Sequence, residues 1–571
     1  MMKDLILKHA LKNAIEHGGK AIVGAVISKV IAEKPELKTR IKELSKEISE
    51  IVKEVNELSV EEQKKKLEKV APELLEKKKI EEKKGLKPLP NAEKGKVVTR
   101  LPPEPSGFMH IGHGMSGLLN YLYAKMYDGK VWLRFEDTNP RKVRKEYYDS
   151  FRRGYRWLGI EWDYEKRNSD DIEIYYKYAS KLVLSGAMYA CECKKDKIRK
   201  NRSVGIECEH RSNSIEENFE KWEKMLAGFY KEGEIIFRLK GDMNSKNYVM
   251  RDPTLFRIVD FPHPFTREKY KVWPTYDFSV AIEDSICGIT HVLRSSEFAQ
   301  RGELQNRIRE LLNLKGPLII EYSRFNFKGS PVSKRKIRPL IESGIIKTWD
   351  DPRLTTIDGI RRRGIIPEAI REFTITQTGI TQSERAYEWE LLFAVNRKML
   401  DPITKRYFVV LDPIKVLVKN APSMVVKLKY HPEKELGFRE IKVNGIFYLQ
   451  RDDVRLFKEN DIIRLKDLFN IKIEKISEKE VIASFYGKEM IEKVPKVQWV
   501  TDENVKLVVY YPDVLFINDE VNKRSLEMKR GIGEIACSSL KEGDIIQAER
   551  IGFMRLDKKE NDELSFIFSH R

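Results

Sequence analysis

Two histidines stand in a stretch rich in proline and glycine, PEPSGFMHIGHGMSG, at residues 103–117. A helix beginning here would offer unpaired N–H groups and about half a positive charge at its N-terminus, which suits a phosphate. Gly112 and Gly114 would let a ligand approach the backbone closely. His110 and His113 could then donate hydrogen bonds to negative charge that develops during phosphoryl transfer. Taken alone, the motif is also compatible with histidines that are incidental to a glycine-rich loop.

A second polar loop, GSPVSKRKIRPL at residues 329–340, carries Ser333, Lys334, Arg335 and Lys336. Such a loop could close over a triphosphate and neutralise a leaving pyrophosphate. Most basic runs of this kind are solvated surface loops. The two motifs together are far more specific than either one, and they predict nucleotide chemistry.

A group of sulfur and imidazole ligands follows a Cys-x-Cys and Cys-x-His spacing: Cys191, Cys193, Cys208 and His210. Three sulfurs and one imidazole make a closed tetrahedral set for zinc, of the structural kind. The alternative is reduced thiols in a charged loop, with the histidine solvated. The remaining cysteines, Cys287 and Cys537, stand in apolar runs and are predicted to lie in the core.

The elements that would position the histidines form a βαβ unit. KVVTRL at 96–101 predicts a strand, GMSGLLNYLYAKMYDG at 114–129 a helix, and KVWLRFED at 130–137 a second strand. Strand, glycine-rich loop, helix and strand are typical of the opening of a nucleotide-binding α/β fold. Beyond about Tyr407, short strand patterns separated by turn residues predict β-barrels or sandwiches.

The first 90 or so residues are predicted to be helical. Apolar residues recur there at helical spacing and form an amphipathic stripe: Ile41, Leu44, Ile48, Ile51 and Val55. Prolines and lysines near residues 87–96 indicate a linker. The lysines are expected to form a solvated face, although the stripe would permit docking of a partner protein.

Composition sets the class of protein. The 571 residues have 41% hydrophobic content, which indicates a multidomain globular chain without the ~18–20 uninterrupted apolar residues of a membrane span. Neither a signal peptide nor a disulfide framework is apparent, so a cytoplasmic location is expected. Lys plus Arg outnumber Asp plus Glu by 107 to 88, a formal charge of +19. This surplus fits a nucleic-acid partner and equally a heat-adapted surface.

At this point the chain resembles the class I aminoacyl-tRNA synthetases, in their glutamyl and glutaminyl branch. The matching text is TRLPPEPSGFMHIGHG, LRFEDTNP, MRDPTLFRI, WPTYDFSVAIEDSICGITHVLRSSEF, VSKRKI, WDDPRLTTIDGIRRRGI and IQAERIGFMRLDK. It spans roughly Thr99 to Lys558 and leaves the N-terminal residues unexplained. The resemblance implies a Rossmann-type catalytic domain that activates an amino acid with ATP and Mg²⁺ and transfers it to the 3′ end of tRNA.

The resemblance also implies roles for individual residues. His110, His113 and Lys334 would be catalytic. The expected ATP-binding set is Pro103, His110, Gly112, His113, Ser333, Lys334 and Arg335. The expected amino-acid set is Arg100 for the carboxylate region, Glu136 for the α-amino group, and Tyr276 and Arg294 for the side chain. Val332 departs from the Met or Leu that relatives carry before the Ser-Lys pair.

Arg294 decides between the two amino acids of the branch. Members specific for glutamate resemble this chain in carrying an arginine there, whereas those for glutamine carry a small uncharged residue. A guanidinium pairs two-pronged with a carboxylate and cannot match an amide in the same way. A surface arginine in a salt bridge is the less favoured interpretation. The expected activity is therefore ligation of L-glutamate to tRNA(Glu), extending in some members to tRNA(Gln).

The same resemblance divides the chain. The expected parts are a helical extension and linker at 1–95, a catalytic domain at 96–345 with an acceptor-stem and zinc insertion at 191–271, a helical connection at 346–405, and two anticodon-binding β-barrels at 406–571. Such strands resemble the paired β-barrels of glutaminyl enzymes and of archaeal- or eukaryotic-type glutamyl enzymes, and the leading expectation is the archaeal glutamyl type. One alternative is a glutaminyl-tRNA synthetase, which Arg294 disfavours, and another is a non-catalytic tRNA-binding descendant, which the intact motif residues disfavour. A third is a smaller adenylyltransferase with the same histidine motif, which the long β-rich C-terminus disfavours.

Overall fold

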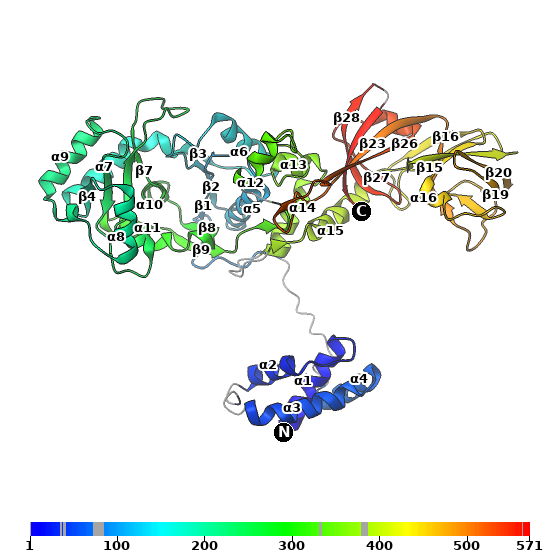
Figure 1. Cartoon of the computed structure of the whole chain (residues 1–571), viewed down its shortest axis with the longest axis horizontal. Helices are drawn as coiled ribbons and strands as arrows, with labels where there is room; N and C mark the ends of the chain where they lie inside the picture. The colour runs from blue at the N-terminus through cyan, green and yellow to red at the C-terminus, as the bar shows by residue number, and fades with distance from the viewer. Residues whose placement is uncertain are drawn as a thin grey trace. The chain divides into compact units, whose positions relative to one another are not determined.

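The computed structural model describes residues 2–34, 37, 41–71, 85–330, 334–378, 386–561 and 563–571. The chain divides into two compact units, residues 1–84 and 85–571 (Figure 1). Within the described parts of both units, every helix is too short or too polar to cross a lipid bilayer.

The first unit is helical, as the sequence predicts. Its helices are α1 (Met2–Glu16), α2 (Val23–Glu33), α3 (Ile41–Asn56) and α4 (Val60–Val70). Leu44, Ile48, Ile51 and Val55 of the predicted stripe are all buried in a core that α1 to α4 share. The stripe therefore stabilises the unit itself, because burial against the neighbouring helices removes its apolar surface from water.

The expected linker is partly packed onto the second unit. Leu89 is buried in the core beneath the first parallel strands, and its N–H donates to the Tyr127 hydroxyl at 2.9 Å. The carbonyl of Pro90 lies 3.0 Å from the His291 Nε2. Residues 86–92 thus form an irregular strap on the catalytic domain, because their apolar side chains find a place in its core.

A parallel sheet lies at the centre of the second unit. Its strands are β1 (Val98–Leu101), β2 (Lys130–Phe135), β3 (Tyr164–Arg167), β8 (His291–Ser295) and β9 (Leu318–Tyr322). The helices between them are α5 (Ile111–Met126), α6 (Lys145–Trp157), α10 (Tyr276–Ile286) and α11 (Arg301–Leu311). Strand β2 pairs in parallel with β1 and β3, and β8 pairs in parallel with β9. The Thr290 N–H donates to the Val98 carbonyl at 3.0 Å, which places β8 beside β1. The predicted βαβ unit is confirmed.

An antiparallel sheet interrupts this domain between β3 and α10. The inserted segment contains the strands β4 (Met188–Cys191), β5 (Ile236–Leu239), β6 (Thr254–Ile258) and β7 (Val272–Pro274). Its helices are α7 (Ile172–Leu184), α8 (Lys195–Val204) and α9 (Ile215–Leu226). Its strands are ordered β4-β5-β6-β7. After β9 come β10 (Asn326–Phe327), α12 (Lys334–Glu342), α13 (Ile357–Arg362), α14 (Pro367–Phe373), β11 (Ala386–Tyr387) and α15 (Trp389–Leu400).

Two seven-stranded sheets make up the C-terminal part. One contains β12 (Arg406–Tyr407), β13 (Val409–Leu411), β23 (Asn504–Pro512), β26 (Leu526–Glu534), β27 (Ile545–Ala548), β28 (Gly552–Glu560) and β29 (Glu563–His570). The other contains β14 (Pro413–Lys419), β17 (Ile446–Gln450), β18 (Ile462–Leu465), β19 (Asn470–Ile476), β20 (Glu480–Gly487), β21 (Lys496–Val497) and β22 (Val500–Thr501). The ribbon β15 (Met424–Lys429) and β16 (Phe438–Val443), the hairpin β24 (Phe516–Ile517) and β25 (Glu520–Val521), and the short helix α16 (Arg451–Val454) complete this part.

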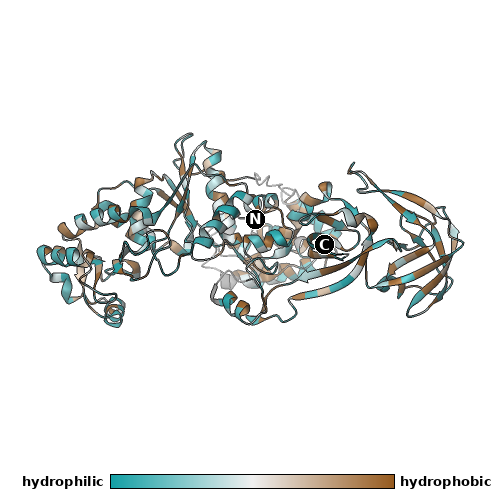
Figure 2. Cartoon of the chain, turned by 90° about the horizontal axis from the view of Figure 1, so that it is seen from above, coloured by the Kyte–Doolittle hydropathy of each residue, from teal (hydrophilic) through white to brown (hydrophobic). Residues whose placement is uncertain are grey.

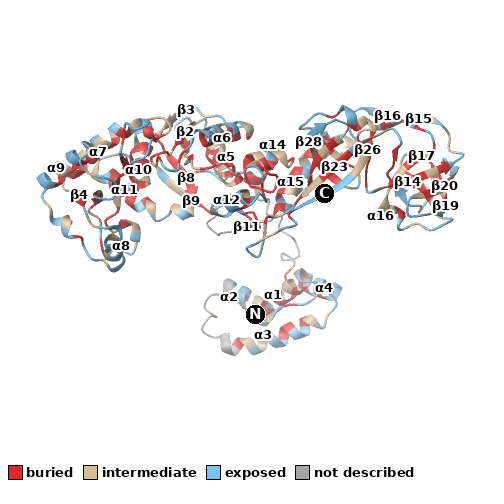
Figure 3. Ribbon diagram, turned by 45° about the horizontal axis from the view of Figure 1, so that its top comes forward, coloured by how far each residue is buried: buried red, intermediate tan, exposed pale blue. Residues whose placement is uncertain are grey.

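Each of these sheets closes into a barrel. The edge strands of the first, β12 and β13, are successive parts of one segment, 406–411, and those of the second, β21 and β22, belong to segment 496–501. Closure leaves no free edge for aggregation. Buried and more exposed residues alternate along β14 and β17 (Figure 3), and hydrophobic and hydrophilic residues follow one another along several strands of this part (Figure 2). The predicted C-terminal barrels are confirmed.

Candidate active site

One cavity of about 500 Å³ brings the separate sequence motifs together. It lies where β1, β2 and β8 end and α5 begins, and the carboxyl ends of parallel strands are the usual place for a ligand. Eight of the predicted residues line it: Arg100, Pro103, His110, Gly112, His113, Glu136, Tyr276 and Arg294. These residues are up to about 200 positions apart in the sequence, so only the fold assembles them.

The two histidines cap helix α5 reciprocally. The His113 N–H donates to His110 Nδ1, and the His110 N–H donates to His113 Nδ1, both at 3.4 Å. The rings stack with centroids 3.6 Å apart. Because Nδ1 accepts in each ring, the neutral rings carry their proton on Nε2, where it can be donated. Burial holds the pKa of His110 well below its ordinary value, with His113 and Arg324 adding to the effect, so its ring stays uncharged.

The glycines of this motif have different surroundings. Gly112 lines the cavity, and a Cβ there would lie 3.0 Å from the His110 ring. Gly114 is buried, and its Cβ would meet Leu158 at 2.9 Å. The expectation that Gly114 makes room for a ligand is therefore wrong, because this glycine serves the packing of α5 against its neighbours.

One buried carboxylate, that of Asp284, pairs with three arginines beside the cavity. Asp284 of α10 lies 3.1 Å from the Nε of Arg100, 2.8 Å from an Nη of Arg134 and 3.2 Å from an Nη of Arg309. All four side chains are at most 3% exposed. Burial acts to raise the pKa of Asp284, but the three guanidinium groups outweigh it and hold the pKa below its ordinary value.

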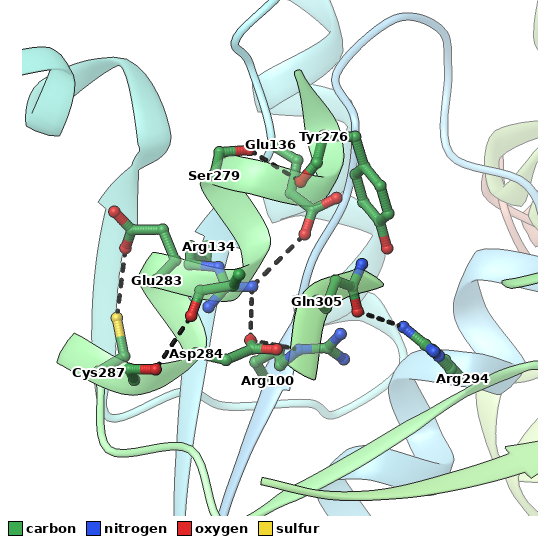
Figure 4. A network of polar contacts seen from close by, with 12 residues as sticks. Arg100, Arg134, Glu136, Tyr276, Ser279, Glu283, Asp284, Cys287, Arg294 and Gln305 are labelled. Carbon is green, nitrogen blue, oxygen red and sulfur yellow. Dashed lines mark hydrogen bonds and ion pairs between the residues drawn. The ribbon is translucent and has the colours of Figure 1, made fainter. Parts of the chain in front are cut away.

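Glu136 stands above this cluster, directly after β2 (Figure 4). Its carboxylate lies 3.5 Å from an Nη of Arg134. Burial raises the pKa of Glu136 to about 7, and the nearby Arg134 and Arg100 only partly offset that rise. The carboxylate is thus poised to gain from a cation entering the cavity. The Nη1 of Arg100 is buried and has no hydrogen-bond partner within the described part of the chain, which leaves a donor for an anion.

Tyr276 and Arg294 face the cavity from different elements. Tyr276 begins α10, and Arg294 lies in β8 with only 6% of its side chain exposed. Arg294 Nη1 donates to Gln305 Oε1 at 2.8 Å, whereas its Nε and Nη2 are buried and find no hydrogen-bond partner among the residues that the structure describes (Figure 4). Tyr276 therefore contributes a ring and a hydroxyl, and Arg294 contributes a guanidinium with N–H groups left for a ligand, although Glu321 forms an ion pair with its Nη2 at 3.6 Å.

The second motif is only partly described. Ser333 lies outside the described residues, as do the side chains of Lys334 and Arg335, although Lys334 begins α12. Lys336 is described, and its Nζ lies 2.7 Å from an oxygen of Asp519 in the β24–β25 hairpin. The first barrel therefore contacts α12, the helix that carries Lys336 of the second motif.

The four predicted metal ligands converge in the insertion: Cys191, Cys193, Cys208 and His210, whose ligand atoms all lie within 4.8 Å of one another. The Sγ atoms of Cys191 and Cys193 lie 3.6 and 3.5 Å from that of Cys208, whose Sγ is 3.3 Å from His210 Nδ1. A tetrahedral zinc ion with ~2.3 Å bonds needs sulfurs about 3.8 Å apart, so this donor set fits such an ion. The other ring nitrogen of His210 faces Glu192 at 3.6 Å, as the histidine ligand of a metal often faces a carboxylate. Cys287 and Cys537 are buried away from the cluster, as expected for core residues.

Sequence reasoning missed the supporting residues Arg134, Asp284 and Gln305. All three are at most 1% exposed although each is polar. A signal existed for two of them, because VWLRF places one charge inside an otherwise apolar strand and AIEDSI places two acidic residues inside a largely apolar helix. Nothing in the sequence indicates which partners these charges would have.

Comparison with known proteins matches nearly all of the second unit. The model for the catalytic domain of class I tRNA synthetases (E and Q) matches residues 96–402, and two anticodon-binding domain models of the same group match 404–488 and 496–557. The glutamate–tRNA ligase of Pyrococcus furiosus is 44% identical over 584 residues, with 100% of both chains covered. That of Nitrosopumilus maritimus is 44% identical over 574 residues, with 100% of this chain and 99% of the other covered. A crystal structure of a glutamate tRNA ligase from Elizabethkingia meningosepticum, in complex with its amino acid, has a TM-score of 0.41 at 18% identity over 54% of this chain and 70% of that chain.

The arginine cluster around Asp284 makes a stability prediction. In Asp284→Asn, three buried guanidinium groups lose their shared anion, which we expect to cost about 3–5 kcal/mol in the folding of the catalytic domain. Differential scanning calorimetry should show a transition several degrees lower. Asp260→Asn, at an exposed carboxylate paired with Lys271, is the matched control and should leave the transition unchanged. Equal behaviour of the two variants would contradict the role given to Asp284.

Proposed function

The chain belongs to the class I tRNA synthetases of the E and Q group, and we propose that it is the ATP-dependent ligase that joins L-glutamate to the 3′ end of tRNA(Glu). The observation that carries this proposal is the single cavity in which Arg294, with unpaired N–H groups, stands with Glu136 and the histidine pair. The similarity to archaeal glutamate–tRNA ligases over the whole chain supports the same activity.

The reaction would begin with ATP at the N-terminus of α5. His110 and His113 would each donate an Nε2–H to phosphate oxygens, beside the positive end of the helix. The α-carboxylate of glutamate attacks the α-phosphorus, forming the glutamyl-adenylate, and pyrophosphate leaves. Ser333, Lys334 and Arg335 would close on the departing charge, with Mg²⁺ accompanying the triphosphate. A ribose hydroxyl of the terminal adenosine of the tRNA then takes the glutamyl group, and AMP is released.

The amino acid would be recognised at both of its ends. Glu136 would accept the α-ammonium group, and Arg100 would donate to the carboxylate region. The glutamate side chain would lie along Tyr276 and end at Arg294, whose free donors match the two oxygens of a carboxylate. An amide offers one acceptor and no charge, so glutamine would give the buried guanidinium no charged partner beyond Glu321 at 3.6 Å, a cost of about 2–5 kcal/mol relative to glutamate.

The insertion cluster would hold a structural zinc ion. Cys191, Cys193, Cys208 and His210 offer four protein ligands, which leaves no position open for a substrate. Bound there, the ion would supply structural cross-linking between the end of β4 and the turn after α8. Arg238, whose Nη1 lies 3.8 Å from the Cys191 sulfur, would stabilise the thiolate.

The tRNA specificity and a protein partner belong to the same proposal. The two closed barrels are suited to reading unstacked anticodon bases, as single-stranded RNA is usually read. Charging of tRNA(Gln) with glutamate in addition would follow from these barrels and not from the amino-acid cavity. A partner protein of the N-terminal helices would have to bind their outer faces, because the apolar stripe is buried within that unit.

Charging assays test the activity directly. Purified tRNA(Glu) and tRNA(Gln) are each offered labelled glutamate and labelled glutamine, and we expect glutamate to be transferred and glutamine not. Arg294→Met should lower kcat/KM for glutamate by roughly 10²–10³-fold, because the carboxylate loses its cation. Arg307→Met, at an exposed arginine of α11 that is paired with Glu310, is the control and should behave as wild type. Transfer of glutamine by the wild-type protein would refute the assignment.

The proposed role of Glu136 predicts a pH dependence. The carboxylate must be ionised to hold the ammonium group, and burial raises its pKa to about 7. The ionised fraction therefore grows as the pH rises through 7, so kcat/KM for glutamate should climb about tenfold per pH unit below 7 and level off above it. Glu136→Gln should lower kcat/KM and abolish this limb. An identical limb in the variant would show that another group titrates.

The zinc proposal predicts the metal content and local stability. Elemental analysis should find about one zinc per chain, because one closed ligand set is present in the described residues. Cys193→Ser should lose the metal and speed hydrogen exchange over residues 188–212. Cys287→Ser, at a buried thiol outside the cluster, should keep it. Zinc-free protein with wild-type exchange rates would end this proposal.

A further inference from the structure

Arg294 is anchored at one end only. Its Nη1 donates to Gln305 Oε1 at 2.8 Å, while its Nη2 lies 3.6 Å from an oxygen of Glu321, beyond hydrogen-bond reach. Among the described residues, neither Nε nor Nη2 has a hydrogen-bond partner, although both atoms are buried. The guanidinium therefore has one bond that fixes its orientation and further donors that remain for a ligand (Figure 4).

Gln305 is itself held so that its oxygen faces the arginine. The side chain is fully buried in α11, and its Nε2 donates to Asp277 Oδ1 of α10 at 3.3 Å. A carboxylate can only accept, so the amide must turn its NH₂ toward Asp277 and its Oε1 toward Arg294. The other oxygen of Asp277 is paired with Arg301. A relay thus runs from Arg301 through Asp277 and Gln305 to Arg294.

The surface of α11 is shaped around the same guanidinium. Gly302 lies one helical turn before Gln305, and a Cβ at Gly302 would stand 3.0 Å from Arg294 Nη2. A larger side chain would push the guanidinium toward the cavity or away from Glu321. Helix α11 therefore fixes the Arg294 guanidinium in two ways: Gln305 accepts a hydrogen bond from it, and Gly302 leaves room for it because that residue has no side chain.

We propose that Gln305 is a positioning residue for amino-acid selection, which orients Arg294 toward the carboxylate of the substrate side chain without neutralising it. This inference rests on the proposed function. A neutral acceptor is what the position requires, because a carboxylate there would pair two-pronged with Arg294 and occupy the donors meant for the substrate. Asp277 supplies the negative charge one step further away, where Arg301 balances it.

The first test removes the hydrogen bond and keeps the side-chain volume. Gln305→Met should raise KM for glutamate roughly tenfold, the effect of losing one hydrogen bond to a charged group, and leave kcat and KM for ATP within about twofold. Leu304→Met, at the neighbouring buried position that packs into the insertion core, is the control and should leave all three constants unchanged. An unchanged KM for glutamate in Gln305→Met, or an equal rise in Leu304→Met, would overturn the proposal.

The second test keeps the shape and makes the position titratable. In Gln305→Glu, the protonated acid imitates the amide, with a carbonyl toward Arg294 and an O–H toward Asp277. The ionised acid pairs with Arg294. The surrounding charges are Arg294 of β8, Asp277 of α10, Arg301 of α11 and Glu321 of β9. Relative to wild type at each pH, KM for glutamate should therefore rise roughly tenfold as the pH climbs through the range in which the introduced acid ionises. A ratio that does not change with pH would contradict the relay.

Charging by the wild-type protein distinguishes failure of the proposed function from failure of the role given to Gln305. If it fails to charge tRNA with glutamate, the proposed function itself fails. If it charges normally and the variants at position 305 keep a wild-type KM, the activity stands and Gln305 is only a packing residue. Thermal melting of each variant alongside these assays confirms that the comparisons are made between folded proteins.

Discussion

The buried carboxylate of Asp284 is the interaction on which the rest of the cavity depends. It joins Arg100 of β1, Arg134 of β2 and Arg309 of α11 to helix α10, in a place that excludes water. Glu136 and Glu283 lie near Arg134 as well, so their charges offset part of the charge of the three guanidinium groups. The remaining positive charge is what the cavity can offer to a substrate that carries carboxylates and phosphates.

The polar groups of the cavity are correspondingly left incomplete. Arg100 has a buried N–H without a partner, Arg294 has two such atoms, and Glu136 faces the cavity with a raised pKa. Unpaired buried groups destabilise a fold by themselves, but a ligand of opposite charge restores what they lack. An amino acid with an extra carboxylate would complete all three. Recognition and stability are therefore coupled, because the groups that cost folding energy are those that the ligand satisfies.

The first barrel contacts the catalytic domain at α12. The β24–β25 hairpin of the first barrel places Asp519 beside Lys336, and Leu515 packs in a small core with Ile337 and Leu340. Gly329 lies so near the same hairpin that a Cβ would stand 2.8 Å from Val514. Gly329 and α12 thus pack against the part of the chain that matches an anticodon-binding model. These contacts require the first barrel and the catalytic domain to be folded against each other.

The sequence by itself determined the elements and indicated candidate residues for the chemistry. Local patterns predicted the βαβ unit, the helical N-terminal unit and the barrel strands, because hydrophobic periodicity and turn residues act over short ranges. Resemblance supplied His110, Glu136 and Arg294. Only the tertiary structure decided which charges meet, that Gly114 serves packing, and that residues 86–92 join the core. Those outcomes depend on contacts between residues as far apart as Arg100 and Asp284, and no local pattern encodes the partner of a buried charge.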